Sequence, residues 1–267
     1  MSSLFNRLAR SATLRRLVLA LRLHKLGNGW LRIFPQKRRL GNSGIIYRAT
    51  RLESIPLASE MFENAALYDA NLLPGNFTSF VDLGCNVGYF TCWLASLAQG
   101  RKLNGLVCDA NPAALNEAAW HCQANRMDRV YPLNGVVGEG AVGARSDFYL
   151  YESNICSTSH LTEELKQQLK GKWTRISVPC LSIESEWRKR FGDQRCNLLK
   201  MDVEGSELRF LQAEPGFLKL VDAVLIEWHT WGATLDDLKK TLGEYGFRHI
   251  KTLDESETMG TAFFSRP

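Results

Sequence analysis

Acidic residues are absent from the beginning of this chain of 267 residues, in which Glu53 is the first Asp or Glu. Eleven of the 33 Lys and Arg lie within residues 1–50, which leaves 22 for the rest of the chain against all 28 acidic residues. The sequence therefore joins a basic leader to a mildly acidic body. Such an asymmetry predicts an anionic partner for the leader.

The chain also lacks three patterns that would indicate other classes of protein. Its seven cysteines are odd in number, form no C-x-x-C pair and accompany no histidine cluster, which argues against a disulfide framework and a structural zinc site. No apolar run approaches the roughly 18 residues of a membrane-spanning helix. Arg22 interrupts the apolar stretch LVLAL and no small-residue cleavage site follows, so no secretory signal is predicted. We expect reduced thiols in a cytoplasmic enzyme.

The basic leader has a pattern of its own. Residues 4–25 interleave apolar side chains with Arg and Lys at helical spacing. This predicts a basic amphipathic helix, which suits an anionic membrane surface contacted through residues 1–40. The alternatives are a helix packed on the flank of the domain, a frayed terminus and a transit peptide. The stretch FPQKRRLGNSG, residues 34–44, is typical of a basic linker. We therefore assign residues 1–44 to leader and linker and residues 45–267 to one domain.

From residue 79 onward, segments with strand patterning alternate with segments of helical spacing. This order predicts an α/β domain with a doubly wound, mostly parallel sheet. The pattern loosens over residues 138–180, where we expect a hairpin-like insertion with a short polar helix, and residues 45–75 are expected to form a lid or substrate segment. The predicted strands of the sheet cover residues 79–85, 105–110, 129–137, 197–203, 223–229, 248–256 and 260–266.

The first predicted strand runs into a glycine turn, Asp82-x-Gly84-Cys85-Asn86-x-Gly88. Ligands of such sheets bind beyond the carboxyl ends of the strands, and glycine lets the backbone approach them closely. The third glycine of the G-x-G-x-x-G dinucleotide fingerprint is absent. A carboxylate at Asp82 would repel a pyrophosphate and suit an ammonium group. This indicates a cofactor with an amino-acid moiety, S-adenosylmethionine.

A second acid, Asp109, ends the second predicted strand, where a carboxylate accepts hydrogen bonds from ribose hydroxyls. A glycine turn or a strand-end Asp alone recurs in any Rossmann-like fold, but the two together predict a cofactor site. On the third strand, Asn134 and the backbone of Gly135 and Val136 are expected near the adenine. The alternative for Asn134 is that it caps the strand end.

Charged residues interrupt a strand that should be almost entirely apolar. In LLKMDVEGSE, the two-residue period places Lys200, Asp202 and Glu204 on one face, although a central parallel strand is covered on both sides. A structural explanation for these charges is a Lys200–Asp202 ion pair. A functional explanation is that the end of this strand lies at the base of a reaction centre, beside the methyl donor. Glu227 and His229 share a face of the next strand. Because His229 titrates nearest neutrality, it is our first candidate for a general base, with Asp202 or Glu204 as rival.

Five motifs in this order resemble the FkbM family of S-adenosylmethionine-dependent methyltransferases: FVDLGCNVGYFT, VCDANP, LNGVVGEGAVG, LLKMDVEGSELRFL and VLIEWH. The resemblance covers roughly residues 47–250. It implies a class I methyltransferase sheet with a final antiparallel strand. It also implies O-methylation of a hydroxyl on a sugar, glycolipid or polyketide-type metabolite.

The resemblance also implies roles for individual positions. Cys85 stands where the family usually has Ala, a sterically mild difference. Asp109 replaces the usual Glu and ANP replaces a Pro-containing spacing, so the ribose contact is expected to be remodelled. The residues that match the cofactor positions of the family are Asp82, Gly84, Asn86, Gly88 and Asp109, and those that match its second motif are Lys200, Asp202, Glu204, Gly205 and Glu207.

The expected reaction is an in-line displacement in which the acceptor oxygen attacks the methyl group while a base takes its proton. The leaving group is neutral, so no metal is required, although acid clusters can recruit Mg²⁺. Alternatives are N-methylation of an amide or amine, a non-catalytic cofactor-binding adaptor docked on membranes, and a nicotinamide-dependent oxidoreductase. The missing glycine and Asp82 argue against the last.

The expected partner is a small hydroxyl-bearing metabolite or glycan. No nucleic acid is expected, because the body is acidic and no aromatic residues interleave a basic surface. Candidates for contacting or covering the acceptor are Arg51, Glu60 and Tyr68, together with residues 157–160 of the insertion.

Overall fold

The structure is a computed structural model that describes residues 23–63, 68–151, 157–168 and 171–267. The amphipathic helix predicted over residues 4–25 lies almost entirely outside the described residues. The part of the chain that the structure does describe begins with α3 (Leu23–Ile33). None of the helices in this part has the length and apolarity needed to cross a bilayer.

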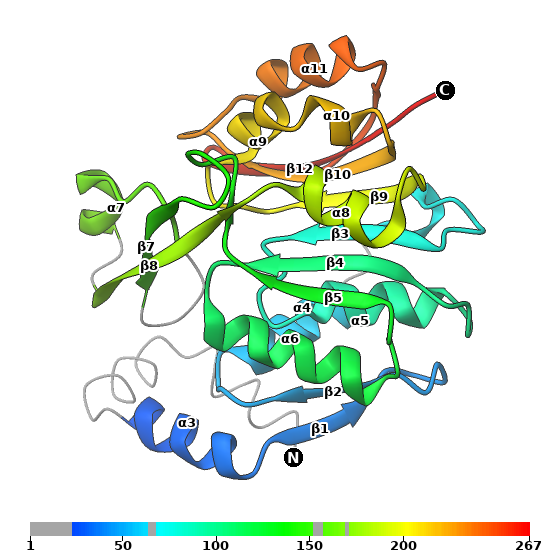
Figure 1. The fold of residues 1–267 in the computed structure, drawn as a ribbon. Coiled ribbons are helices and arrows are strands. Elements are labelled where there is room, and N and C mark those ends of the chain that lie inside the picture. Colours follow the sequence, from blue (N-terminus) through cyan, green and yellow to red (C-terminus); the bar gives the residue numbers. More distant parts are fainter. Residues whose placement is uncertain (1–22, 64–67, 152–156, 169–170) are drawn as a thin grey trace.

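A seven-stranded sheet forms the centre of the molecule (Figure 1), with the strand order β11-β12-β10-β9-β3-β4-β5. The five strands from β10 to β5 pair in parallel, and β12 pairs antiparallel with both β10 and β11. The predicted fold class, a doubly wound class I methyltransferase sheet with a final antiparallel strand, is therefore confirmed. The strands are β3 (Ser79–Leu83), β4 (Asn104–Asp109), β5 (Val130–Asn134), β9 (Cys196–Met201), β10 (Val221–His229), β11 (Arg248–Glu255) and β12 (Met259–Ser265).

Helices cover both faces of this sheet. On one face, the core joins Val81 and Leu83 to side chains such as Trp187 and Phe210, which come from the helices α8 to α11. On the other face, Phe80 packs with side chains of α5 and α6. Asn111 caps α6 and Thr234 caps α11 through their side chains. The helices are α4 (Ser54–Glu63), α5 (Tyr89–Leu97), α6 (Pro112–Ala124), α7 (Glu163–Gln168), α8 (Ile183–Phe191), α9 (Glu207–Ala213), α10 (Pro215–Leu218) and α11 (Leu235–Glu244), with the 3₁₀ turn η1 (Ala70–Leu72).

A second sheet carries the insertion. Its order is β6-β8-β7, with β6 (Val136–Val137), β7 (Arg145–Tyr151) and β8 (Trp173–Leu181). The antiparallel β7–β8 pair confirms the expected hairpin-like insertion. The single strand predicted over residues 129–137 is wrong, because the chain leaves the main sheet at Gly135. A Cβ there would lie 2.5 Å from the Pro179 carbonyl oxygen, so β8 approaches this point closely.

The linker predicted over residues 34–44 is also wrong in part. Gln36–Arg39 form β1, which pairs antiparallel with β2 (Ile46–Ala49). A hydrogen bond from Leu40 N–H to the Ile45 carbonyl, 2.8 Å long, closes the turn. Helix α6 and its C-cap hold β2 in place, because His121 Nε2 accepts from Arg48 N–H at 2.9 Å and Asn125 Oδ1 accepts from Ile46 N–H at 2.7 Å. The division of the chain after residue 44 stays a prediction.

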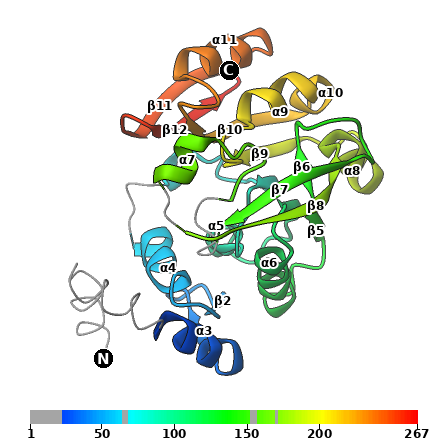
Figure 2. The ribbon, with the colours of Figure 1, turned by 90° about the vertical axis from the view of Figure 1, so that its left-hand side faces the viewer.

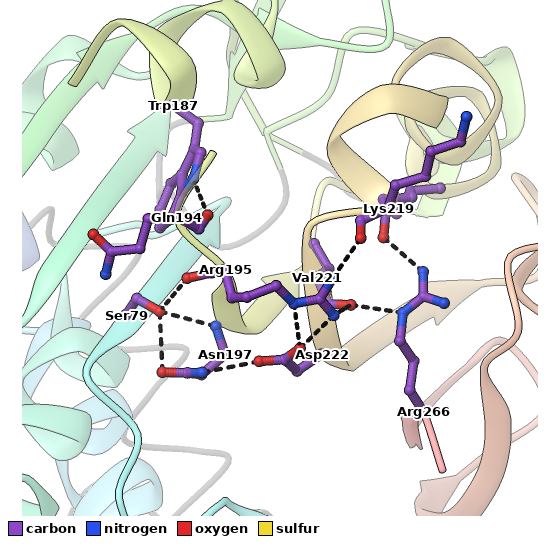
Figure 3. A network of polar contacts seen from close by, with 10 residues as sticks. Ser79, Trp187, Gln194, Arg195, Asn197, Lys219, Val221, Asp222 and Arg266 are labelled. Carbon is purple, nitrogen blue, oxygen red and sulfur yellow. Dashed lines mark hydrogen bonds and ion pairs between the residues drawn. The ribbon is translucent and has the colours of Figure 1, made fainter. Parts of the chain in front are cut away.

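At the amino ends of the strands, a polar network joins β3, β9 and β10 (Figure 3). Asn197 Nδ2 donates to Asp222 Oδ2 at 2.9 Å, and Asn197 Oδ1 accepts from Ser79 Oγ at 3.0 Å. Arg195 Nε donates to Asp222 Oδ1 at 2.8 Å. These bonds fix the relative positions of three parallel strands, and thereby of their carboxyl ends, where the charged residues gather.

Candidate active site

An open cleft lies at the carboxyl ends of the strands, between the turn after β3 and the residues that follow β9. Its empty volume is about 730 Å³, open solvent included. The insertion contributes one wall of it. The lining residues are Gly84, Asn86, Cys108, Asp109, Ala110, Asn111, Ala114, Gly135, Val136, Val137, Phe148, Ser157, Ser159, Asp202, Val203, Glu204 and Ser206.

The glycine turn divides into residues that line the cleft and residues that hold the turn. Gly84 and Asn86 line it. Gly84 has a φ of +69°, and a Cβ there would lie 1.6 Å from the carbonyl oxygen of Asp202, so only glycine fits between the two segments. Gly88 serves packing, since its Cβ would lie 2.8 Å from that of Ala118 on α6. Cys85 is buried, and burial raises the pKa of its thiol well above the ordinary range.

Asp82 does not line the cleft. Its side chain is completely buried, on the face of the sheet that α5 covers. Thr91 Oγ1 donates to Asp82 Oδ2 at 2.9 Å, and the ammonium group of Lys200 lies 3.5 Å from Oδ1. Burial raises the pKa of Asp82, and the charge of Lys200 opposes this rise. The ammonium group that faces Asp82 in this structure is therefore that of Lys200.

Lys200 joins the glycine turn to the acidic motif. Its Nζ donates to the Gly84 carbonyl oxygen at 3.0 Å and lies 3.5 Å from both Asp82 and Asp202. Burial alone would lower the pKa of Lys200, but the carboxylates of Asp202 and Asp82 raise it above the ordinary value. The Lys200–Asp202 ion pair, the structural explanation for the charges in this strand, is thus present. Through these contacts, Lys200 positions the glycine turn relative to Asp82 and Asp202.

Asp109 has the position expected of a ribose acceptor. It lines the cleft, and its two oxygens accept hydrogen bonds from the backbone N–H groups of Asn86 and Asn111, each 2.7 Å long. Burial raises the pKa of Asp109 to about 6. Each carboxylate oxygen has a second lone pair for a ligand hydroxyl. Asn134 points elsewhere: its Nδ2 donates to the carbonyl oxygens of Asp109 and Ala110, as the capping alternative predicts.

The cleft therefore fits S-adenosylmethionine on the chemistry of its lining. Asp109 offers hydrogen-bond acceptors for the ribose hydroxyls, and Ala110, Val136 and Val137 offer an apolar surface for the adenine ring. A carboxylate for the amino-acid end of the cofactor is available from Asp202, whose side chain is 29% exposed.

Acidic side chains surround one buried histidine beside the cleft. His229, at the end of β10, lies with its Nδ1 3.1 Å from Glu207 Oε1. Its Nε2 lies 3.5 Å from Glu204 Oε2 and 3.9 Å from Glu227 Oε1. Glu207 is fully buried and also accepts the Gly205 N–H at 3.1 Å. In the sequence, Glu207 was a candidate only because it matches the second motif of the family. The structure shows that its carboxylate orients the His229 ring.

This cluster perturbs the protonation of its members. Burial and the Asp202 carboxylate raise the pKa of Glu204 to about 8, and the same two causes raise the pKa of Glu227 to about 8. Burial alone would lower the pKa of His229, but Glu207, Glu204 and Asp202 raise it to about 9. At neutral pH the imidazole is therefore a cation that offsets the surrounding acids.

Three of these residues have the spacing of metal ligands. Asp202, Glu227 and His229 each offer one ligand atom, and the three atoms lie within 4.8 Å of one another. Only a neutral imidazole coordinates a metal ion. The raised pKa of His229 therefore makes a proton a strong competitor for this position.

The insertion holds the loop that carries Glu204. Thr158 is buried, and its Oγ1 donates to the Glu204 carbonyl oxygen at 3.1 Å. Glu204 itself has a φ of +52°, a conformation that is costly for a non-glycine residue and persists only where the surroundings fix it. A second link is Glu139, whose Oε1 accepts from Ser206 Oγ at 3.1 Å. No pattern in the sequence indicated these two positioning roles.

The remaining candidates lie apart from the lining. Arg51 pairs with Glu53 at 3.7 Å, and Glu60 is exposed on α4. Tyr68 is buried against Phe90, with ring centroids 5.2 Å apart. Burial raises its pKa, while the charge of the nearby Lys200 opposes the rise. Tyr68 is therefore the one of these three that approaches the charged cluster.

The chain is similar to one family model and to several solved structures. A model of the methyltransferase FkbM domain matches residues 82–249, and no curated protein matches the chain. Among solved structures, M. jannaschii TYW2 in complex with AdoMet shares 14% identity over 87% of each chain, with a TM-score of 0.43. M. capricolum TrmK, in complex with S-adenosyl-homocysteine, shares 12% over 75% of this chain and 69% of its own, with a TM-score of 0.42. The mitomycin 7-O-methyltransferase MmcR shares 13% over 79% of this chain and 54% of its own, with a TM-score of 0.40.

The family match spans more than half of the chain and contains both the glycine turn and the acidic motif. The chain therefore belongs to the FkbM family of S-adenosylmethionine-dependent methyltransferases.

Proposed function

We propose that this methyltransferase acts on a hydroxyl group of a sugar, glycolipid or polyketide-type metabolite, with Glu204 as the general base. The observation that carries the proposal is the position of Glu204. It lines the cleft, its pKa is raised to about 8, and it lies 3.5 Å from the imidazole of His229. A general base with a pKa near the working pH is ionised in a useful fraction of the molecules and still binds a proton strongly enough to remove it from the acceptor.

The division of roles follows from which side chains reach the cleft. Gly84, Asn86, Asp109 and Gly135 would hold the cofactor. When bound, S-adenosylmethionine supplies an electrophilic methyl group on a sulfonium centre. The chain has to hold an acceptor oxygen in line with that methyl group and remove its proton. Most of the rate acceleration is expected from this positioning.

His229 was the first candidate for the base, and its surroundings favour another role. With a pKa raised to about 9, the imidazole already carries its proton at neutral pH. We therefore assign the rival, Glu204, as the base and His229 as a cation that stabilises the ionised carboxylate. Glu207 fixes the ring through Nδ1.

The acid cluster also favours oxygen over nitrogen as the methylated atom. Carboxylates beside the cleft would bind an amine as its ammonium ion, whose lone pair is blocked. A neutral hydroxyl has no such difficulty, and a carboxylate that accepts its proton makes the oxygen more nucleophilic.

The test is transfer of a labelled methyl group from S-adenosylmethionine to panels of glycans, glycolipids, polyketide alcohols and amines. Tandem mass spectrometry of the products locates the methyl group. We expect label on oxygen, in a reaction that requires Glu204. Label on nitrogen, or full transfer by the Glu204→Gln variant, would overturn the proposal.

A further inference from the structure

One face of α3 carries large apolar side chains in solvent. Leu26, Trp30 and Ile33 of the helix, and Phe34 directly after it, are between 60% and 72% exposed. Their spacing places them on a single stripe of the helix. The rings of Trp30 and Phe34 lie 5.7 Å apart, so the stripe is continuous. Contiguous exposed apolar surface of this kind marks an interaction site.

The opposite face of α3 is anchored to the domain. Leu31 is only 4% exposed. Asn28 Oδ1 accepts from the Leu52 N–H at 2.8 Å, and its Nδ2 donates to Glu53 at 3.2 Å. Gly27 approaches Leu52 so closely that a Cβ would lie 2.6 Å from its Cδ1. These contacts hold the apolar stripe outward in a fixed orientation.

Positive charge borders the stripe. The strand β1 follows α3 directly, and all four of its residues are exposed, including Lys37, Arg38 and Arg39. Arg32 adds another exposed cation. Within the described residues, no ion pair joins a carboxylate to Arg32, Arg38 or Arg39. Figures 1 and 2 show α3 at the end of the molecule opposite α11.

We propose that the apolar stripe of α3 and the basic strand β1 together dock on an anionic lipid membrane. The stripe requires a hydrocarbon partner and the arginines require anionic groups, and the interface of an anionic bilayer presents both within a few ångströms. A second copy of this chain fits less well, because a two-fold contact would bring two cationic surfaces together. The proposal stands apart from the methyl-transfer reaction.

The test uses the full chain and sedimentation with vesicles of equimolar phosphatidylcholine and phosphatidylserine. Vesicles of phosphatidylcholine alone are the control. We expect binding to the anionic vesicles that falls at least tenfold in the double variant Trp30→Ser/Phe34→Ser and in the double variant Arg38→Glu/Arg39→Glu.

Matched variants outside α3 and β1 control for the change in composition. Val142→Ser removes an apolar side chain that is 69% exposed, and Lys239→Glu/Lys240→Glu reverses two exposed charges on α11. Both are expected to bind vesicles like the wild type. Circular dichroism checks that every variant is folded.

Two results would overturn the proposal. The first is vesicle binding that neither the apolar nor the charge-reversal variant changes, which would assign it to another segment. The second is a wild-type dimer that Trp30→Ser/Phe34→Ser converts to a monomer, which would make the stripe a contact between copies. Methyl transfer to soluble acceptors is measured in parallel, so failure of membrane docking is distinguished from failure of the proposed reaction.

Discussion

Replacement of Glu204 by Gln is expected to raise the stability of the protein while it lowers its activity. The surroundings raise the pKa of Glu204 from 4.5 to about 8. Between these values the folded protein retains a proton that the unfolded chain has released, so this group makes stability fall as pH rises. The full difference corresponds to about 5 kcal/mol. Because Glu227 shares the same cluster of charge, we expect Glu204→Gln to recover about 1–3 kcal/mol above pH 8.

The activity of the same variant reports on the proposed base. Loss of a general base lowers kcat by a factor of about 10²–10⁴. In the wild type kcat should rise with pH through about 8, where Glu204 ionises, and this rise should be absent from the variant.

Two measurements check the prediction for Glu204. The first is the free energy of unfolding in urea at pH 5 and pH 9, and the second is the pH profile of kcat. Glu244→Gln, an exposed change on α11, is the control and should alter neither. A Glu204→Gln variant that is no more stable than the wild type at pH 9, or that keeps the pH profile of kcat, would refute the reasoning.

Three further changes test other parts of the structure. Gly84→Ala would place a Cβ 1.6 Å from the Asp202 carbonyl oxygen and should abolish S-adenosylhomocysteine binding in calorimetry, whereas Gly100→Ala, with a similar φ of +82° and open space, should retain it. His229→Gln should destabilise the protein below pH 6.5, and urea unfolding should show that this loss fades as pH rises through about 9, since the raised pKa stabilises only the protonated state. Asn197→Ala removes the partners of the half-buried Thr78 N–H and of Asp222 Oδ2 at the amino ends of the strands; it should cost about 1–3 kcal/mol in thermal unfolding without weakening cofactor binding.

The sheet could be predicted from the sequence because its strands are apolar runs that alternate with capped helices. Asn111 and Thr234 are capping residues at the positions where α6 and α11 begin. Shorter or more polar elements gave no comparable signal. The strand β1 consists of four exposed residues, and the helix α8 carries only two buried side chains, so neither has a clear hydrophobic period.

The composition of the site was predictable, whereas the direction of its side chains was not. Sequence adjacency to the glycine turn suggested that Asp82 would meet the cofactor. Its place in the alternation of β3 instead directs it to the face that α5 covers, where Lys200 lies 3.5 Å away. The hydrogen bond from Thr158 to Glu204 spans 46 positions of the chain, and no local pattern reports such a contact.

That hydrogen bond links two properties that enzymes often keep separate. The insertion, which would contact the acceptor, carries Thr158, and the loop after β9 carries the proposed base, Glu204. The Thr158 hydroxyl donates to the Glu204 carbonyl oxygen and so joins the two segments. Replacing the insertion with that of a relative, in order to change substrate preference, would also change the backbone geometry of the loop that carries Glu204. Substrate range and catalytic competence in this protein should therefore evolve together, and redesign of one requires compensation in the other.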